Sequence, residues 1–489
     1  MSSAILLSIV LAYFLLLLGI AFYTSRHSNN ESFFIGNRSS KWWVVAFGMI
    51  GTSLSGMTFI SVPGTVGKSG FDYFQVVIGY WLGYFAVAYI LLPIYYKMQL
   101  TSIYTYLEKR LGVTSYKTGA LFFILSRTLG ATLRLYLVIK VLEKFVLEDM
   151  GIPFEATAII ILALILLYTF KGGVKTIVWT DTLQTTFMLL SLLVCVGYIM
   201  HDMHLGLGST WQAMKAQGYT KMLHTDALAP NYFLKQILGG AFITIAMTGL
   251  DQEMMQKNIS VSNLADSKKN MISFCFIMVA ANFIFLLLGG LLYLYAGANG
   301  IAVAGDDLFP TIAVKSGLPF FITICFIVGL VSALFPSADG ALTALTSSFC
   351  IDILGMKRRT DWDEKKRSRV RLTVHNVFAL IFLACVFFFR MVDNGSLIQT
   401  LLVVAGYTYG PLLALFIFGI FTKRQVNHRS VPVICVAAPI ICYILKQYDK
   451  EWLGGYSIGT ELLIINAALT FLLLLLFSGK DRQLEFKEI

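Results

Sequence analysis

The chain has 489 residues, of which 57% are hydrophobic and only 13% are charged, whereas a soluble domain carries about 25% charged residues. A chain this apolar cannot cover itself with polar surface in water, which excludes a soluble enzyme, a nucleic-acid-binding protein and a disordered protein. The net charge of +11 does not require nucleic acid as a partner, because membrane proteins collect Lys and Arg in their cytoplasmic loops.

Thirteen apolar segments follow one another along the chain, and a membrane-spanning helix needs about 20 such residues. The segments are too long for barrel strands and do not alternate with a period of two. The sequence therefore predicts an all-α, polytopic membrane protein with about 13 transmembrane helices in one domain, residues 1–489. The predicted spans are 4–23, 42–66, 75–97, 117–146, 154–170, 176–200, 233–252, 269–296, 318–350, 372–393, 397–421, 430–446 and 459–477.

The loops between these spans differ in charge. The loop after the ninth span, 357–371, holds eight Lys and Arg, and alternate loops together collect 26, against eight on the other side. Because basic loops stay in the cytoplasm, we expect an outside N-terminus and a cytoplasmic C-terminus, in the plasma (inner) membrane. The basic side receives 24–42, 97–117, 171–175, 255–269, 357–371, 422–430 and the C-terminal tail.

Polar residues interrupt the second predicted span. Residues 48–64 read GMIGTSLSGMTFISVPG, with five Ser and Thr side chains among the glycines. Glycines alone are equally well explained by close packing of helices. The hydroxyl groups favour a binding site at this depth.

The seventh predicted span is interrupted as well, near Gly249 and Asp251, five spans later. Interrupted helices at matching places in two halves are typical of an inverted repeat with a binding site at the bilayer midplane. Unwound backbone there frees carbonyl groups that can coordinate a cation. We expect repeats at 42–200 and 233–421, with accessory helices at 4–23 and 430–477.

The ninth predicted span carries an ionisable residue, Asp339, beside Ser337. A carboxyl inside a span indicates a functional site, and Pro336 removes a backbone donor, which frees a carbonyl near Ser332 and Ala333. Oxygen groups of this kind suit a monovalent cation. The hydroxyls at 343–348 are more simply explained by hydrogen bonds to their own helix.

Asp181 opens the sixth predicted span. A carboxylate at a helix start is stabilised by the helix dipole alone, so its position leaves a structural and a functional role equally open.

In order along the chain, these motifs resemble those of the sodium/solute symporter family, which includes sodium-coupled proline, glucose and sialic acid carriers. The resemblance covers nearly the whole chain. It implies a ten-helix inverted-repeat core with two discontinuous helices, and alternating access driven by inward sodium, in a transporter rather than an enzyme. The motifs are ESFFIGNRSSKWW, SLSGMTFISVPG, TSIYTYLEKRLG, GGVKTIVWTDTLQ, DQEMMQ, SAD with SSFCIDI, and AGYTYGPLLALFIFGIFTKR.

The resemblance also implies positions for the coupling ions. The principal sodium site falls on the carbonyls of Gly51, Leu54 and Ala333 and on a hydroxyl pair at Pro336 and Ser337. Proline has no hydroxyl, so this site departs from the family pattern. A second ion would use Asp181 and hydroxyls that fall on Asp339 and Gly340, and glycine offers no ligand there.

For the solute, the run SLSGMTF is most similar to the sialic acid branch of the family, which leads us to expect a sugar or sugar acid. The implied contacts are Ser53, Ser55 and Thr58. The anion-binding arginine of that branch falls on Gly130, and Arg134 lies one turn further along; pairing with a carboxylate or snorkelling is its structural alternative. Further lining residues are expected at Phe71 and Gln75.

Sodium symport has three alternatives. A channel would need a continuous polar stripe along several spans, and a membrane enzyme would need a cluster of His, Asp or Glu at one face; neither pattern is present in the sequence. Proton-coupled symport through Asp181 or Asp339 is the nearest alternative. The expected partners are the small solute, Na⁺ and the lipid bilayer, without nucleic acid or an obligate protein partner.

Overall fold

The computed structural model describes residues 3–24, 40–392 and 397–479. The motif at 31–43 and the predicted loop 24–42 lie mostly outside these ranges, as does the C-terminal tail. In the described chain, helices pack side by side into one bundle, and the strands β1 (Gln425–Val426) and β2 (Ser478–Gly479) form a short antiparallel pair.

Long helices follow the predicted apolar segments. Among the described residues, nine helices are long and apolar enough to cross a membrane, and two bent pairs raise the number to 11. Two shorter apolar stretches, Phe154–Leu167 and Leu462–Leu476, add to these. The long helices are α1 (Ser3–Thr24), α5 (Tyr73–Ala86), α8 (Val113–Leu142), α9 (Phe154–Asp202), α13 (Leu264–Ala298), α15 (Phe320–Ser348), α16 (Glu364–Met391), α17 (Leu397–Phe421) and α18 (Ser430–Gln447), and the shorter Leu462–Leu476 is α20.

Shorter elements complete the chain. Several long helices end in or continue through π-helical turns: η2 (Val87–Leu91), η3 (Glu143–Leu147) and η7 (Phe349–Ile353). The remaining short helices are α6 (Leu92–Lys97), α7 (Thr105–Leu111), η4 (Glu148–Met150), α10 (Leu207–Ala216), η6 (Gly305–Asp307), α14 (Leu308–Lys315), η8 (Met356–Arg358) and α19 (Asp449–Trp452).

Both predicted interruptions are confirmed as broken helices. The first separates α3 (Trp42–Ser53) from α4 (Gly56–Ser69), with a bend of 56°. The second lies between η5 (Ile245–Gly249), which continues α11 (Phe233–Thr244), and α12 (Gln252–Ile259), with a bend of 64°. The two discontinuous helices of the expected fold are therefore present.

Two predicted loops are wrong. The backbone stays helical from 154 to 202, so residues 171–175 form part of α9 and not a loop. The segment 255–269 was expected to be cytoplasmic, but its first residues belong to α12, which is buried throughout. Lys257 is therefore an interior residue and does not count among the 26 basic residues assigned to the cytoplasmic loops.

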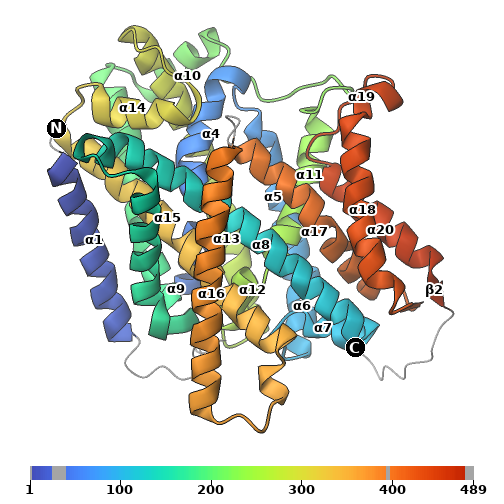
Figure 1. Cartoon of the computed structure of the whole chain (residues 1–489). Helices are drawn as coiled ribbons and strands as arrows, with labels where there is room; N and C mark the ends of the chain where they lie inside the picture. The colour runs from blue at the N-terminus through green and yellow to red at the C-terminus, as the bar shows by residue number, and fades with distance from the viewer. Residues whose placement is uncertain (1–2, 25–39, 393–396, 480–489) are drawn as a thin grey trace.

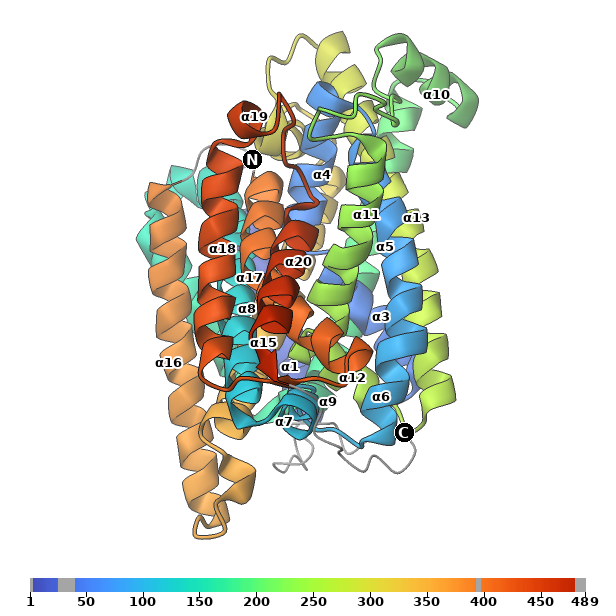
Figure 2. The same ribbon diagram turned by 90° about the vertical axis from the view of Figure 1, so that its right-hand side faces the viewer.

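Alternate connections gather at opposite ends of the bundle. Helices α10, α14 and α19 lie at one end, and α7 lies at the other (Figures 1 and 2). These are the ends to which the charge pattern assigns those four connections. Between the ends, α15 packs along α9 and α8, and α3 packs against α9, which places the first break deep inside the molecule.

Candidate functional site

A cavity opens beside the first helix break, in the middle of the bundle. Its lining atoms surround about 750 Å³ of space, which includes space open to solvent. Hydroxyl groups and two arginines face an apolar wall, and no Asp or Glu belongs to the lining among the described residues. The lining residues are Thr52, Ser53, Ser55, Met57, Thr58, Tyr73, Tyr80, Tyr84, Arg127, Arg134, Ile243, Thr244, Met247, Thr248, Met254, Met278, Asn282, Ile398, Leu401 and Leu402.

The first break places backbone oxygens beside this cavity. Helix α3 ends at Ser53, and Ser55 is extended, with φ −78° and ψ 174°. The last carbonyls of a helix have no partner within it, so those near Gly51 and Leu54 remain available. Gly51 also permits a close approach, because a Cβ there would lie 2.5 Å from Oγ1 of Thr185 and 3.5 Å from Cγ of Pro336.

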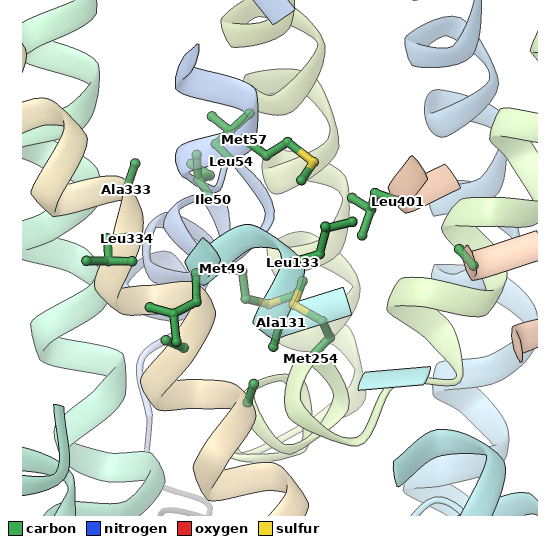
Figure 3. Close-up of a cluster of buried hydrophobic side chains, with 14 of the residues drawn as sticks. Met49, Ile50, Leu54, Met57, Ala131, Leu133, Met254, Ala333, Leu334 and Leu401 are labelled. Atoms are coloured by element: carbon green, nitrogen blue, oxygen red, sulfur yellow. The ribbon is translucent and has the colours of Figure 1, made fainter. Parts of the chain in front are cut away.

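The predicted sodium ligands thus come from two neighbouring helices. Ala333, Pro336 and Ser337 lie buried on α15, next to the end of α3. Figure 3 shows Leu54 at the break and Ala333 on the helix beside it, with apolar side chains around them. The Ser337 hydroxyl donates to the carbonyl of Leu334 at 2.9 Å, which leaves its oxygen lone pairs for a cation. Helix α15 continues without interruption through Pro336.

At the second break, side chains of the protein form hydrogen bonds with the backbone carbonyls. Tyr95 donates its hydroxyl hydrogen to the carbonyl of Gly249 at 2.7 Å, and Tyr104 donates to the carbonyl of Leu250 at 2.9 Å. The Asp251 carboxylate caps α12, accepting from the backbone N–H groups of Glu253 and Met254 at 2.9 and 3.1 Å. Because these carbonyls already accept from tyrosine, the first break is the better candidate for a cation site.

A buried charge network joins the two breaks. Arg127 on α8 pairs with Glu253 on α12, and its Nε lies 3.7 Å from Oδ2 of Asp251. The Lys257 ammonium lies 2.6 Å from Oδ2 of Asp181 and 3.2 Å from Oε1 of Glu253. Because an unpaired charge in the interior is costly, each of these groups depends on its partners.

The two carboxyls predicted for a second ion occupy different surroundings. Asp181 does not lie at a helix start, since α9 runs through it, and it is bound by Lys257 and by the hydroxyl of Thr52 at 3.2 Å. Asp339 is buried on α15 and accepts a hydrogen bond from the backbone N–H of Gly340. Asp181 is therefore already engaged with a cation that belongs to the protein.

The two arginines of the cavity differ in their partners. Arg127 faces Glu253 and Asp251, so its charge is compensated. Arg134 lies two turns further along α8 and is 8% exposed, and its Nε has no hydrogen-bond partner within the described residues. A carboxylate entering the cavity would meet Arg134 without having to displace an acidic side chain.

Of the predicted solute contacts, Ser53, Ser55 and Thr58 line the cavity together with Arg134. Phe71 and Gln75 do not belong to its lining. Phe71 is buried against the rings of Trp211 and Phe283, each at 5.9 Å. These two residues are placed in the wall of the bundle and not in the cavity.

Gln75 anchors the connection that carries α10. It donates to the carbonyl of Asp72 at 3.3 Å and to that of Asn231 at 3.4 Å, and it accepts from the backbone N–H of His224 at 3.4 Å. Burial raises the pKa of the neighbouring Asp72 carboxyl, while hydrogen bonding by Asn231 lowers it in part. Gln75 thus has a structural role.

A second cavity adjoins the first on the side of α10 and α19. Its lining atoms surround about 930 Å³, and Tyr73, Ile398 and Leu402 line both cavities. The other lining residues are Thr65, Ser69, Asp72, Val76, Pro230, Asn231, Gln236, Gln399, Val403, Lys446, Ile458, Gly459 and Thr460.

Several residues of the site were missed by sequence reasoning. Glu253 and Lys257 are four residues apart in an ordinary helical pair, and their sequence gives no sign that they point inward. Asn282 lies on a long apolar helix, where a single polar residue is common, and Thr185 lies within the polar run TDTLQTT at 180–186. The aromatic residues Tyr73, Tyr80 and Tyr84 share a helix face with seven- and four-residue spacing, which is a signal in the sequence.

The chain is similar to known proteins over nearly its full length. It is 24% identical over 450 residues to the sodium/sialic acid symporter SiaT of Proteus mirabilis, covering 89% of this chain and 88% of that protein. It is 23% identical to the sodium/sialic acid symporter NanT of Aliivibrio fischeri, covering 92% and 89% of the two chains.

Among solved structures, a Na⁺-coupled sialic acid symporter in a substrate-bound outward-open state superposes with a TM-score of 0.84 at 21% identity, covering 98% of this chain and 99% of that chain. The structure of MhsT in complex with L-phenylalanine superposes with a TM-score of 0.52 at 14% identity, covering 90% of this chain and 98% of that chain. These likenesses confirm the fold of a multi-pass membrane transporter.

The family model of the sodium:solute symporters matches residues 33–429, well over half of the chain. The matched relatives are sodium-coupled transporters and not enzymes. Sodium is therefore the coupling ion, and proton coupling through Asp181 or Asp339 is not favoured. The chain is a sodium-coupled secondary transporter that belongs to the sodium:solute symporter family.

Proposed function

We propose that this protein carries an acidic sugar, of the kind represented by sialic acid, into the cell together with Na⁺. The observation that carries the proposal is Arg134, which faces a cavity whose lining contains two arginines and no carboxylate among the described residues. A guanidinium binds a carboxylate through paired hydrogen bonds.

The remaining lining fits the rest of such a solute. Ser53, Ser55 and Thr58 offer hydroxyl groups at the break, and Asn282 offers an amide. The opposite wall is apolar and aromatic. A zwitterionic amino acid would need an acidic group for its ammonium, and the lining supplies none within the described chain.

We further propose that Na⁺ binds between the carbonyls of Gly51, Leu54 and Ala333 and the hydroxyl of Ser337. The close approach of Gly51 to Pro336 supports this placement. The neighbouring end of α3 adds the partial negative charge of a helix C-terminus. Pro336 supplies no hydroxyl, so Ser337 is the single side-chain ligand of the proposed site.

The breaks at 53–56 and 249–252 support an organisation in two inverted repeats, 42–200 and 233–421, flanked by accessory helices at 4–23 and 430–477. The excess of Lys and Arg in alternate loops supports an outside N-terminus and a cytoplasmic C-terminus in the plasma (inner) membrane.

Uptake into proteoliposomes tests the solute. Purified protein would be offered labelled sialic acid, a neutral hexose and proline, each with and without an inward Na⁺ gradient and at two values of pH. We expect Na⁺-dependent uptake of the sugar acid alone. Uptake of the hexose or of proline, with none of the sugar acid, would refute the proposed solute, and uptake that follows pH and ignores Na⁺ would refute the coupling.

A further inference from the structure

Lys257 lies where both broken helices meet. It projects from α12 toward the end of α3 and toward α9, and its side chain is 3% exposed. An ammonium group has three N–H donors, and three oxygens receive them. These are Oδ2 of Asp181 at 2.6 Å, Oγ1 of Thr52 at 2.5 Å and Oε1 of Glu253 at 3.2 Å.

This set of oxygens has the composition of a monovalent cation site. Two carboxylates and a hydroxyl surround the positive group, and Thr52 belongs to the last turn of α3, where the helix dipole adds negative charge. The Thr52 hydroxyl also donates to Asp181 at 3.2 Å, which orients its lone pairs toward the ammonium. The oxygens around the ammonium are therefore of the kind that bind a monovalent cation.

The space beside this position is adapted to the same arrangement. Gly340 on α15 lies against Glu253, and a Cβ at residue 340 would overlap Oε1 and Cδ of that carboxylate. Glycine therefore admits Glu253, and Glu253 in turn completes the partners of Lys257. A hydroxyl-bearing residue at 340 would displace the acid that holds the ammonium.

We infer that Lys257 acts as a tethered cation that takes the place of a second sodium ion, so that one Na⁺ binds per chain. The inference rests on the proposed sodium site at Gly51 and Ser337. A second free cation at Asp181 would share an oxygen with the Lys257 ammonium, and repulsion between like charges at hydrogen-bond distance excludes it. Lys257 therefore determines the ion stoichiometry without touching the solute.

The test counts bound sodium directly and needs no solute. Equilibrium binding of ²²Na⁺ to purified protein would be measured for the natural sequence, for Lys257→Met, for Asp181→Asn/Lys257→Met and for Lys235→Met. Lys235 is a matched control, because it is also buried but is held by carbonyls and by Glu461 near the other end of the bundle.

We expect one Na⁺ per chain for the natural protein, two for Lys257→Met, and one again for the double variant and for the control. A count of two in the natural protein would overturn the inference even where Lys257→Met does not fold. A folded Lys257→Met protein that still binds one Na⁺ would overturn it as well. A folded natural protein that binds no Na⁺ would refute the proposed sodium site and the inference with it. A count of zero therefore differs from a count of two, which refutes the inference alone.

Discussion

The carboxylate of Glu253 fills the space beside Gly340 into which any larger residue at that position would project. The same carboxylate accepts from Arg127 through Oε2 and from Lys257 through Oε1. One acidic side chain of α12 therefore holds cationic partners from two directions while it packs against α15.

A substitution at Gly340 tests this contact. Gly340→Ser should push Glu253 away from Lys257 and reduce Na⁺-driven uptake at least tenfold, because the displaced acid leaves two buried cations with fewer partners. Uptake and thermal stability of the purified protein would be measured together. Gly197→Ser is the control, since a Cβ at Gly197 meets nothing within 4 Å; similar losses in both variants would contradict the contact.

The ion pair of Asp181 and Lys257 should govern stability. Asp181→Asn leaves the Lys257 ammonium without a charged partner at 2.6 Å, and breaking one side of a buried pair costs about 3–5 kcal/mol. We expect a clearly lower melting temperature for the single variant and a partial recovery for Asp181→Asn/Lys257→Met. A double variant less stable than either single variant would show that the pair is not the source of the effect.

Ser337 should set the affinity for sodium. Ser337→Ala removes the one side-chain hydroxyl of the proposed site, and a net loss of about 0.5–1.5 kcal/mol raises the half-maximal Na⁺ concentration by roughly two- to tenfold. The measurement is uptake as a function of Na⁺ concentration. Thr323→Val, on the same helix, is the control. In the natural protein the Thr323 hydroxyl donates to the carbonyl of Ala313, far from the break, so this variant should leave the Na⁺ dependence unchanged.

Arg134 should set the affinity for the solute carboxylate. A hydrogen bond to a charged group contributes about 1.5–3 kcal/mol, so Arg134→Ala should weaken binding of an acidic sugar by roughly ten- to a hundredfold. Protein abundance should stay unchanged, because no acidic residue is left unpaired. Arg134→Lys keeps the charge but loses the paired hydrogen bonds of the guanidinium. Its affinity for the solute should therefore lie between those of the natural protein and Arg134→Ala. Reduced abundance of Arg134→Ala would instead mark a structural arginine.

Phe71 provides a negative test of the cavity. Its ring packs against Trp211 and Phe283 and does not line the cavity. Phe71→Leu should therefore lower thermal stability and leave the apparent solute affinity within twofold of the natural value. A large change in affinity at unchanged stability would place Phe71 in the solute site.

The sequence predicts the helix breaks well, because their signal is local. Glycines and hydroxyls within an apolar run mark the first break, and Gly249 with Asp251 marks the second. Each break needs only its own neighbourhood to be recognised.

The burial of Lys257 could not be predicted in the same way. A lysine four residues after a glutamate, at the end of an apolar run, has the same pattern as a solvated helix end. Its environment is decided by Thr52 and Asp181, which are more than 70 residues away in the chain. The position of Phe71 outside the cavity lining has the same origin, since its partners come from other helices.

Tyr73, Ile398 and Leu402 line both cavities, so their side chains lie where the two cavities adjoin. On the opposite side the closure is made of packed helices, where Tyr104 binds the backbone at Leu250 and Arg110 binds it at Gly419. Side-chain rotations take picoseconds to nanoseconds when unhindered, whereas helix displacements take microseconds to milliseconds. We therefore expect the side chains at the α10 end to move faster than the packed helices at the far end.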